Sequence, residues 1–293
     1  PIRIAELAKQ FRYEKSGELT GLMRVRSFCL ADAHIICRPD QAFSELNNVL
    51  KLIEHIASVF GLKPGIDYRY RLSLGDRRDE KKYYKDDAAW DFAENVLRKT
   101  LAERKSSFFE LQNEAAFYGP KLDIQMKNVS GKEDTAFTVQ YDFVMPKRFN
   151  LTYIDKDNQK KEAVVIHRSS IGAIERTMAF LIEKYAGAFP VWLAPVQTEI
   201  IAVSEKFNDY GEKITAILEK EGLRVKFDND NETLGKKIRN AQLQKIPYII
   251  VVGEKEEKSG IIAVRERGKG DLGTMKVDDF IKKIKIEIGQ KSL

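Results

Sequence analysis

The chain has 293 residues, of which 43% are hydrophobic and 32% charged, and its formal net charge is +6 at pH 7. That length favours two domains, and that composition is typical of a globular protein. No apolar run approaches the roughly 20 residues of a membrane-spanning helix, and nothing at the N-terminus resembles a signal peptide. With only two cysteines, Cys29 and Cys37, a disulfide framework is excluded and a cytoplasmic location is expected.

The N-terminal segment predicts three strands. IRIAELAKQF is strand-like and follows Pro1 directly, so we expect the first part of its domain to precede this sequence. FRYE and MRVRSF then flank a loop with a turn at Ser16-Gly17, and both favour strands.

The rest of the first 190 residues alternates helical and strand patterns. Apolar residues recur at helical spacing in 40–60 and 87–104, and 170–186 is also expected to be a helix. Strands are expected at 68–74, on both sides of Gly119-Pro120 within 108–128, at 135–145, and in a hairpin around Asp157-Asn158. The pattern predicts an α+β domain with an antiparallel sheet over residues 1–190.

A different pattern follows PVWLAP, residues 190–195, which we interpret as a stiff, extended linker. Beyond it, strands alternate with helices of 12 residues or more. This alternation predicts a second, small α/β domain with a mostly parallel sheet over residues 191–293.

Arginines and an aromatic residue gather in the predicted hairpin. Arg12 lies in FRYE, and Arg24, Arg26 and Phe28 follow at alternate positions, so the last three share one face of a strand. Guanidinium groups bind phosphate oxygens and an aromatic ring stacks on a base, which favours a nucleotide site. On spacing alone, however, an exposed hairpin with solvated arginines is the favoured interpretation.

Two histidines, His34 and His167, lie far apart in the sequence and each follows or ends a predicted strand. On their own they make no metal site.

These segments together resemble a known family. FRxE followed by GLMRVRSF resembles motif 2 of the class II aminoacyl-tRNA synthetases, and DAHIIC after it is similar to the threonyl-tRNA synthetases. Further similarity lies in AFYGPK (116–121), TVQYDF (138–143), IHRSSIGAIER (166–176) and FPVWLAPVQ (189–197). The resemblance covers nearly the whole chain and implies a class II catalytic domain followed by an anticodon-binding domain.

The resemblance implies an ATP site on an antiparallel sheet. Arg12 would hold the α-phosphate and Arg176 the γ-phosphate, so that these two are the catalytic residues. Phe28 would stack on the adenine. The remaining ATP-binding residues that it implies are Glu14, Arg24 and Lys121, with Mg²⁺ bound alongside the nucleotide.

The resemblance also implies a zinc site and a threonine pocket. His34 and His167 would bind Zn²⁺ together with a cysteine that lies upstream in the family, leaving one position open for the substrate. Asp32 would accept a hydrogen bond from the substrate hydroxyl, and Tyr118 and Gln140 would line the same pocket. The sequence departs from the family pattern at Leu30, Ala31, Thr135 and Phe137.

The second domain would contact anticodon bases through Asn231, Arg239, Glu256 and Arg265. The whole resemblance implies a threonine–tRNA ligase that activates L-threonine with ATP and transfers it to the 3′ end of tRNA(Thr), as a homodimer when full length. Two alternatives remain open: a non-catalytic tRNA-binding remnant, and a synthetase paralogue that adenylates another substrate.

Overall fold

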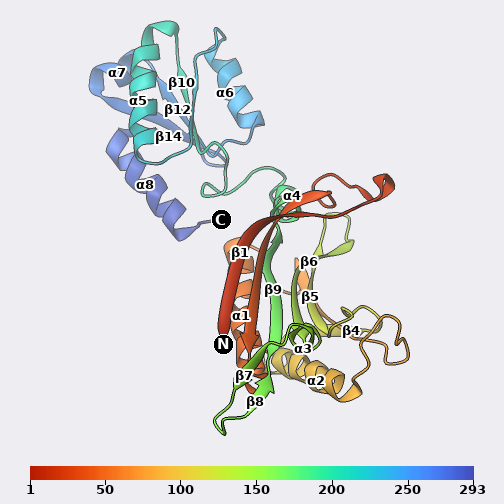
Figure 1. The fold of residues 1–293 in the computed structure, drawn as a ribbon. Coiled ribbons are helices and arrows are strands. Elements are labelled where there is room, and N and C mark those ends of the chain that lie inside the picture. Colours follow the sequence, from red (N-terminus) through yellow and green to blue (C-terminus); the bar gives the residue numbers. More distant parts are fainter. The chain divides into compact units, whose positions relative to one another are not determined.

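The computed structural model describes residues 1–293. It divides the chain into two compact units, Pro1–Lys184 and Tyr185–Leu293, and each is described by itself (Figure 1).

The first unit is built on a seven-stranded sheet with the order β1-β2-β9-β6-β5-β3-β4. All neighbours in it run antiparallel except β3 and β4, which are parallel. The strands are β1 (Ile2–Phe11), β2 (Ser27–Cys37), β3 (Tyr68–Ser73), β4 (Phe108–Leu111), β5 (Lys121–Lys127), β6 (Glu133–Asp142) and β9 (Val164–Ala173). The antiparallel sheet predicted for this half of the chain is therefore confirmed.

One face of this sheet is apolar and carries the core. Helices α1 (Ala42–Val59) and α2 (Asp87–Glu103) pack there with the strands in one buried cluster. Strand β6 shows why: Phe137, Val139 and Tyr141 are almost fully buried among the core residues, while Thr138 and Gln140 alternate with them and point to the other face. Burying each such side chain contributes about 1.5–3 kcal/mol, so the alternation fixes which face remains polar.

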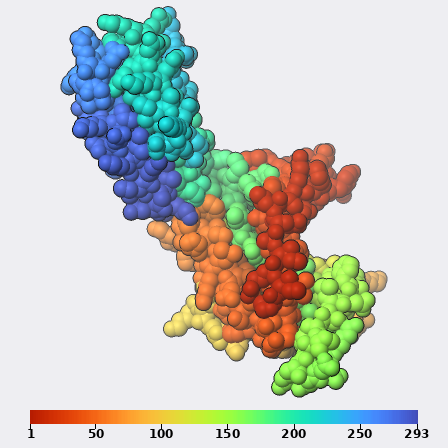
Figure 2. All heavy atoms as spheres, turned by 60° about the vertical axis from the view of Figure 1, so that its left-hand side comes forward, coloured from red at the N-terminus to blue at the C-terminus, as the bar shows by residue number.

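The smaller elements complete the unit. They are η1 (Ser16–Glu18), η2 (Pro39–Gln41), α3 (Met145–Arg148), α4 (Ile174–Tyr185) and the two-stranded hairpin of β7 (Thr152–Ile154) and β8 (Lys160–Glu162). In Figure 2 the hairpin region stands out from the body of the unit, and β1 runs over its outer surface. Strand β1 pairs only with β2, and its Ile2, Leu7 and Phe11 are exposed.

Three predicted elements of this unit differ from the structure. FRYE is not a strand, because β1 ends at Phe11 and residues 12–14 lie in the loop that follows. MRVRSF is not a strand as a whole, because β2 begins only at Ser27 and Arg24 forms just an isolated bridge with Thr20. The helix predicted from residue 170 begins at Ile174, since β9 continues to Ala173. The two strands expected on either side of Gly119-Pro120 are β4 and β5, and β3 lies between them in the sheet.

The second unit has a five-stranded sheet with the order β11-β10-β12-β13-β14. Its strands are β10 (Thr198–Ala202), β11 (Val225–Asp228), β12 (Tyr248–Val252), β13 (Ile261–Glu266) and β14 (Gly270–Lys276). The first three run parallel, but β13 and β14 are antiparallel, so the sheet is mixed rather than mostly parallel. The α/β class predicted for this half is confirmed.

Helices cover both faces of that sheet. Helices α5 (Asn208–Lys220) and α8 (Val277–Gln290) pack in the larger core cluster, and α6 (Leu234–Leu243) packs in a smaller one on the opposite face. Two short elements, η3 (Glu205–Phe207) and α7 (Glu254–Ser259), complete the unit. Across the chain, no helix is both long and apolar enough to cross a membrane.

The segment predicted to be a stiff linker is instead folded into the second unit. Residues 190–194 form a turn, in which Leu193 and Ala194 donate to the carbonyl of Pro190. Val191 is buried in the larger core cluster. The guanidinium of Arg224 donates to the carbonyls of Trp192 (2.9 Å) and Ala194 (2.8 Å). The prediction of an extended linker is therefore wrong, because these carbonyls and Val191 find partners inside the unit.

We expect a fragment of residues 185–293 to be more stable than a fragment of residues 195–293. The shorter piece loses the buried Val191 and leaves Arg224 without its carbonyl partners, which should cost roughly 2–5 kcal/mol. Urea denaturation of both fragments measures the difference. If both fragments unfolded at the same urea concentration, residues 185–194 would contribute nothing to the stability of the second unit.

Candidate functional site

A row of polar side chains crosses the face of the first sheet that α1 and α2 leave uncovered. The register places His34 of β2 opposite His167 of β9, His167 opposite Gln140 of β6, and Gln140 opposite Lys121 of β5. Residues two positions along the strands extend this face, with Thr138 opposite Ser169. Residues from distant parts of the sequence therefore meet because the strands alternate and pair in this order.

A cleft of about 390 Å³ lies over this row. Most of the site residues predicted in the first domain line it, and the His34 ring contacts the ring of His167 at its wall. The predicted residues that line the cleft are Arg12, Glu14, Arg24, Phe28, Asp32, Tyr118, Lys121, Gln140, His167 and Arg176.

At one end of the cleft, cations lie beside an aromatic ring. The Arg12 guanidinium is 5.5 Å from the centre of the Phe28 ring. Arg24 pairs with Glu14 at 2.8 Å, and this hydrogen-bonded pair lowers the pKa of Glu14, whose side chain is buried. Arg26, by contrast, donates to the Glu14 carbonyl and does not line the cleft. The expected row of Arg24, Arg26 and Phe28 is therefore incomplete, because Arg24 and Arg26 precede the start of β2 at Ser27 and do not share its alternation.

Arg176 is fixed at the same end by two carbonyl oxygens. Its Nε donates to Met23 (3.0 Å) and its Nη1 to Thr135 (2.7 Å). Burial lowers the pKa of Arg176, although a guanidinium stays charged in proteins. The neighbouring Glu175 accepts the Cys29 N–H at 3.0 Å with each of its oxygens. The start of α4 is thus joined to β2, which places Arg176 and Phe28 on the same cleft.

The two histidines form a pair. Their ring centres are 4.8 Å apart and the rings are nearly perpendicular. His167 Nε2 lies 2.8 Å from the Asp142 carboxylate, which is fully buried and also accepts the backbone N–H groups of Val144 and Met145. A carboxylate on Nε2 leaves the lone pair on Nδ1, as in metal-binding histidines. No group of three or more histidine, cysteine, aspartate or glutamate side chains forms a metal cluster, so this chain offers two donors.

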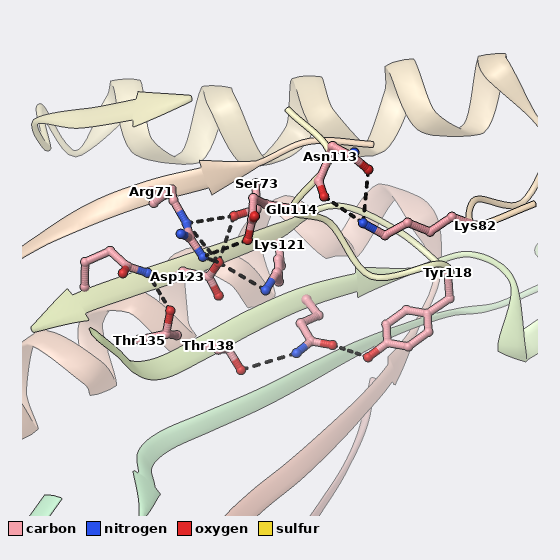
Figure 3. Close-up of polar contacts among 12 residues, drawn as sticks. Arg71, Ser73, Lys82, Asn113, Glu114, Tyr118, Lys121, Asp123, Thr135 and Thr138 are labelled. Carbon is pink, nitrogen blue, oxygen red and sulfur yellow. Dashed lines mark hydrogen bonds and ion pairs between the residues drawn. The ribbon is translucent and has the colours of Figure 1, made fainter. Parts of the chain in front are cut away.

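Hydroxyl and amide groups surround the histidines. The Tyr118 hydroxyl donates to the Gln140 carbonyl oxygen, and Gln140 donates to Thr138 (3.4 Å), as the close-up of this region shows (Figure 3). Burial, with smaller effects of the Asp142 and Asp32 carboxylates, raises the pKa of Tyr118 to about 12. The phenol therefore stays neutral and can donate a hydrogen bond at physiological pH.

Several residues of the cleft escaped the sequence analysis. Thr138, Arg168 and Ser169 line it. Thr138 and Ser169 could have been found, because each lies two positions from a predicted site residue on the same strand. Arg168 could not, since its place depends on the irregular register between β2 and β9.

The residues predicted to read an anticodon lie on separate elements of the second unit. Arg265 on β13 pairs with Asp271 at 3.5 Å. Glu256 accepts the Gly253 N–H at 3.1 Å, so its carboxylate caps the start of α7. Asn231 lies in the loop between β11 and α6, and Arg239 is on α6. Asn231 and Arg239 are both exposed and available to a ligand.

Comparisons with known proteins agree with this geometry. Residues 1–185 match the tRNA synthetase class II core domain (G, H, P, S and T), and residues 194–287 match an anticodon binding domain. The solved RNA binding domain of threonyl-tRNA synthetase from Cryptosporidium parvum is 33% identical with a TM-score of 0.90, covering 98% of this chain and 70% of that one. This chain belongs to the threonyl-tRNA synthetase family of class II synthetases.

Curated members of this synthetase family are more similar still. A threonine–tRNA ligase from Clostridium perfringens is 47% identical over 99% of this chain, and one from a Geobacillus species is 49% identical over 98%. The matched region is 45% and 44% of those two proteins. The chain therefore spans about half the length of the curated relatives it matches.

The Gly172→Ala substitution should disrupt the synthetase cleft. Gly172 has a φ of +74°, and an added Cβ would lie 2.2 Å from the Ala136 carbonyl oxygen. We expect a loss of at least ~1–3 kcal/mol of stability from the backbone conformation alone, measured by chemical denaturation. Gly17→Ala, with nothing within 4 Å of its Cβ, is the control. A Gly172→Ala protein as stable as this control would contradict the packing of β9 against β6.

Proposed function

We propose that this chain is the core of a threonine–tRNA ligase, which forms threonyl-adenylate from L-threonine and ATP and transfers the threonyl group to tRNA(Thr). The observation that supports it best is that a single cleft has a cationic, aromatic end and a polar end. Arg12, Phe28 and Arg176 line the first, and Asp32 and His167 line the second. Two substrates could therefore lie side by side in it.

In the first step, a carboxylate oxygen of threonine attacks the α-phosphorus of ATP and pyrophosphate leaves. This reaction needs fixed positive charge more than a protein nucleophile. Arg12 would stabilise the α-phosphate and Arg176 the γ-phosphate, with Arg24 nearby and Mg²⁺ bound to the nucleotide. Arg176 suits this task because two carbonyls already fix its orientation.

The adenine would stack on Phe28, with Glu14 at the purine edge. Arg12 lies within 5.5 Å of that ring, so the base and the α-phosphate would be bound by neighbouring side chains. In the second step a ribose hydroxyl at the 3′ end of tRNA attacks the threonyl carbonyl, and AMP leaves.

The polar end would bind the amino acid. Tyr118 and Gln140 already hydrogen-bond to each other there, and Asp32 would accept the substrate hydroxyl. His34 and His167 fit as two ligands of a zinc ion, because their rings lie together and Asp142 orients His167. When bound, zinc would supply a Lewis acid for the amino group and hydroxyl of threonine. We propose that a third protein donor lies outside this sequence.

A second candidate function is a non-catalytic tRNA-binding protein. The observation in its favour is that only two metal donors come together in this chain. The two functions differ in the first step, since only the ligase catalyses the exchange of pyrophosphate into ATP. In either case the second unit would bind tRNA, and the homodimer expected for the full-length protein remains a proposal.

The amino-acid preference tests the ligase. In an N-terminally extended chain that supplies the third donor, kcat/KM should be higher for threonine than for valine by a factor of roughly 10⁴–10⁵. The reason is that valine leaves the metal and Asp32 without a partner. Serine keeps the hydroxyl and should be rejected only ~10–200-fold. Pyrophosphate exchange with the three amino acids, together with metal content, measures this for the extended chain and for the present one.

His34→Ala in the extended chain should lower both the metal content and the threonine-to-valine ratio. The matched control is His55→Ala, because His55 is exposed on α1. If His34→Ala left both quantities at the level of this control, the zinc assignment would be wrong.

The anticodon assignment makes a separate prediction. Arg265→Ala should weaken tRNA binding by roughly 1–3 kcal/mol, and the loss should depend on the anticodon sequence if Arg265 contacts a base edge. Filter binding with tRNAs of matched and unrelated anticodons measures the difference, with Lys213→Ala on the exposed side of α5 as the control. An equal loss for all tRNAs would make Arg265 a phosphate contact.

A further inference from the structure

A buried charged cluster lies beside the cleft, on the two strands next to β6. It consists of Arg71 and Ser73 on β3 and Lys121 and Asp123 on β5, and Figure 3 shows the four side chains turned toward one another. Arg71 lies opposite Asp123 and Ser73 opposite Lys121 in the register of the two strands.

The centre of this cluster is the Asp123 carboxylate, which has no exposed surface. Its Oδ2 accepts hydrogen bonds from Ser73 Oγ (2.7 Å) and Arg71 Nη2 (2.8 Å), and the Lys121 ammonium lies 3.2 Å away. Its Oδ1 has no hydrogen-bond partner. A buried carboxylate is costly unless it is paired, and here three donors converge on one of its oxygens.

The two cations of the cluster differ in their surroundings. Arg71 has a second acidic partner, Glu114, at 3.6 Å, and it does not line the cleft. Lys121 has Asp123 alone, its side chain is 20% exposed, and it lines the cleft opposite Gln140. Arg71 is compensated by both Asp123 and Glu114, whereas Lys121 shares Asp123 with Arg71. The Lys121 ammonium is therefore the positive charge that remains to bind an anion in the cleft.

We propose that Asp123, itself held by Arg71 and Ser73, is a positioning residue that sets the Lys121 ammonium at the cleft wall to bind an anionic group of the nucleotide. This rests on the proposed function, which places ATP in the cleft. Asp123 acts only through Lys121, because it has no surface that a ligand could touch.

The removal of the Asp123 charge should change phosphate binding in opposite directions, depending on whether Asp123 acts through its charge alone or by positioning Lys121. Removing a negative charge beside a phosphate site should strengthen phosphate binding by simple electrostatics. Removing the anchor of Lys121 should weaken it, but only while Lys121 is present. A third role, holding β3 to β5, would weaken binding with or without Lys121.

A double-mutant cycle separates these roles. The chain and its Asp123→Asn, Lys121→Ala and doubly substituted variants are titrated with Mg²⁺ and ATP by calorimetry. We expect Lys121→Ala to raise Kd for ATP roughly 10-fold and Asp123→Asn to raise it roughly 3–10-fold. In the Lys121→Ala background, Asp123→Asn should not raise Kd further.

Ser73→Ala is a milder variant that removes one anchor of Asp123 without changing any charge, and it serves if Asp123→Asn does not fold. It should raise Kd roughly 2–3-fold, again only with Lys121 present. Thermal melts of all variants report on folding separately.

An equal loss of affinity in both backgrounds, or a tighter Kd for Asp123→Asn, would overturn the positioning role. Normal ATP binding by the unsubstituted chain together with unchanged binding by Asp123→Asn and Ser73→Ala would overturn this inference alone. An unsubstituted chain that binds no ATP would overturn the proposed function along with it.

Discussion

The two-sided character of the seven-stranded sheet is the constraint on which the rest of the first unit depends. Alternate residues of the inner strands, such as β6 and β9, are buried in the core with α1 and α2, so the residues between them must face the other way. On β9 this alternation leaves Ile166 in the core and places His167 on the polar face. A slip of one residue in any strand would exchange the two faces, so the site and the core are specified by the same register.

The polar face carries buried acids, and each is matched by donors. Asp142 of β6 accepts two backbone N–H groups and contacts His167, and Asp123 of β5 accepts from Arg71 and Ser73. Glu14, in the loop after β1, is buried beside the cleft and pairs with Arg24. A buried carboxylate without such partners would cost several kcal/mol. These pairs therefore orient the side chains of the cleft before any ligand binds, which is how fixed charges stabilise a developing charge most effectively.

The sequence predicted the order and type of most elements, because apolar periodicity and turn residues are local signals. It could not place β3 between β4 and β5, since strand order depends on packing over the whole sheet. The prediction for PVWLAP was wrong. Its two prolines favour an extended chain, but the residues that hold it in a turn, such as Arg224, lie far along the sequence. The family resemblance named most of the polar residues that line the cleft, whereas the Asp123 cluster required the register of β3 against β5.

The most direct test of the account is a crystal structure of the chain with a non-hydrolysable threonyl-adenylate analogue. The account predicts that the adenine stacks on Phe28, that the phosphate mimic lies near Arg12, and that the threonyl hydroxyl faces Asp32 and the His34–His167 pair. An analogue bound in the reverse orientation, or away from the polar face of the sheet, would contradict it.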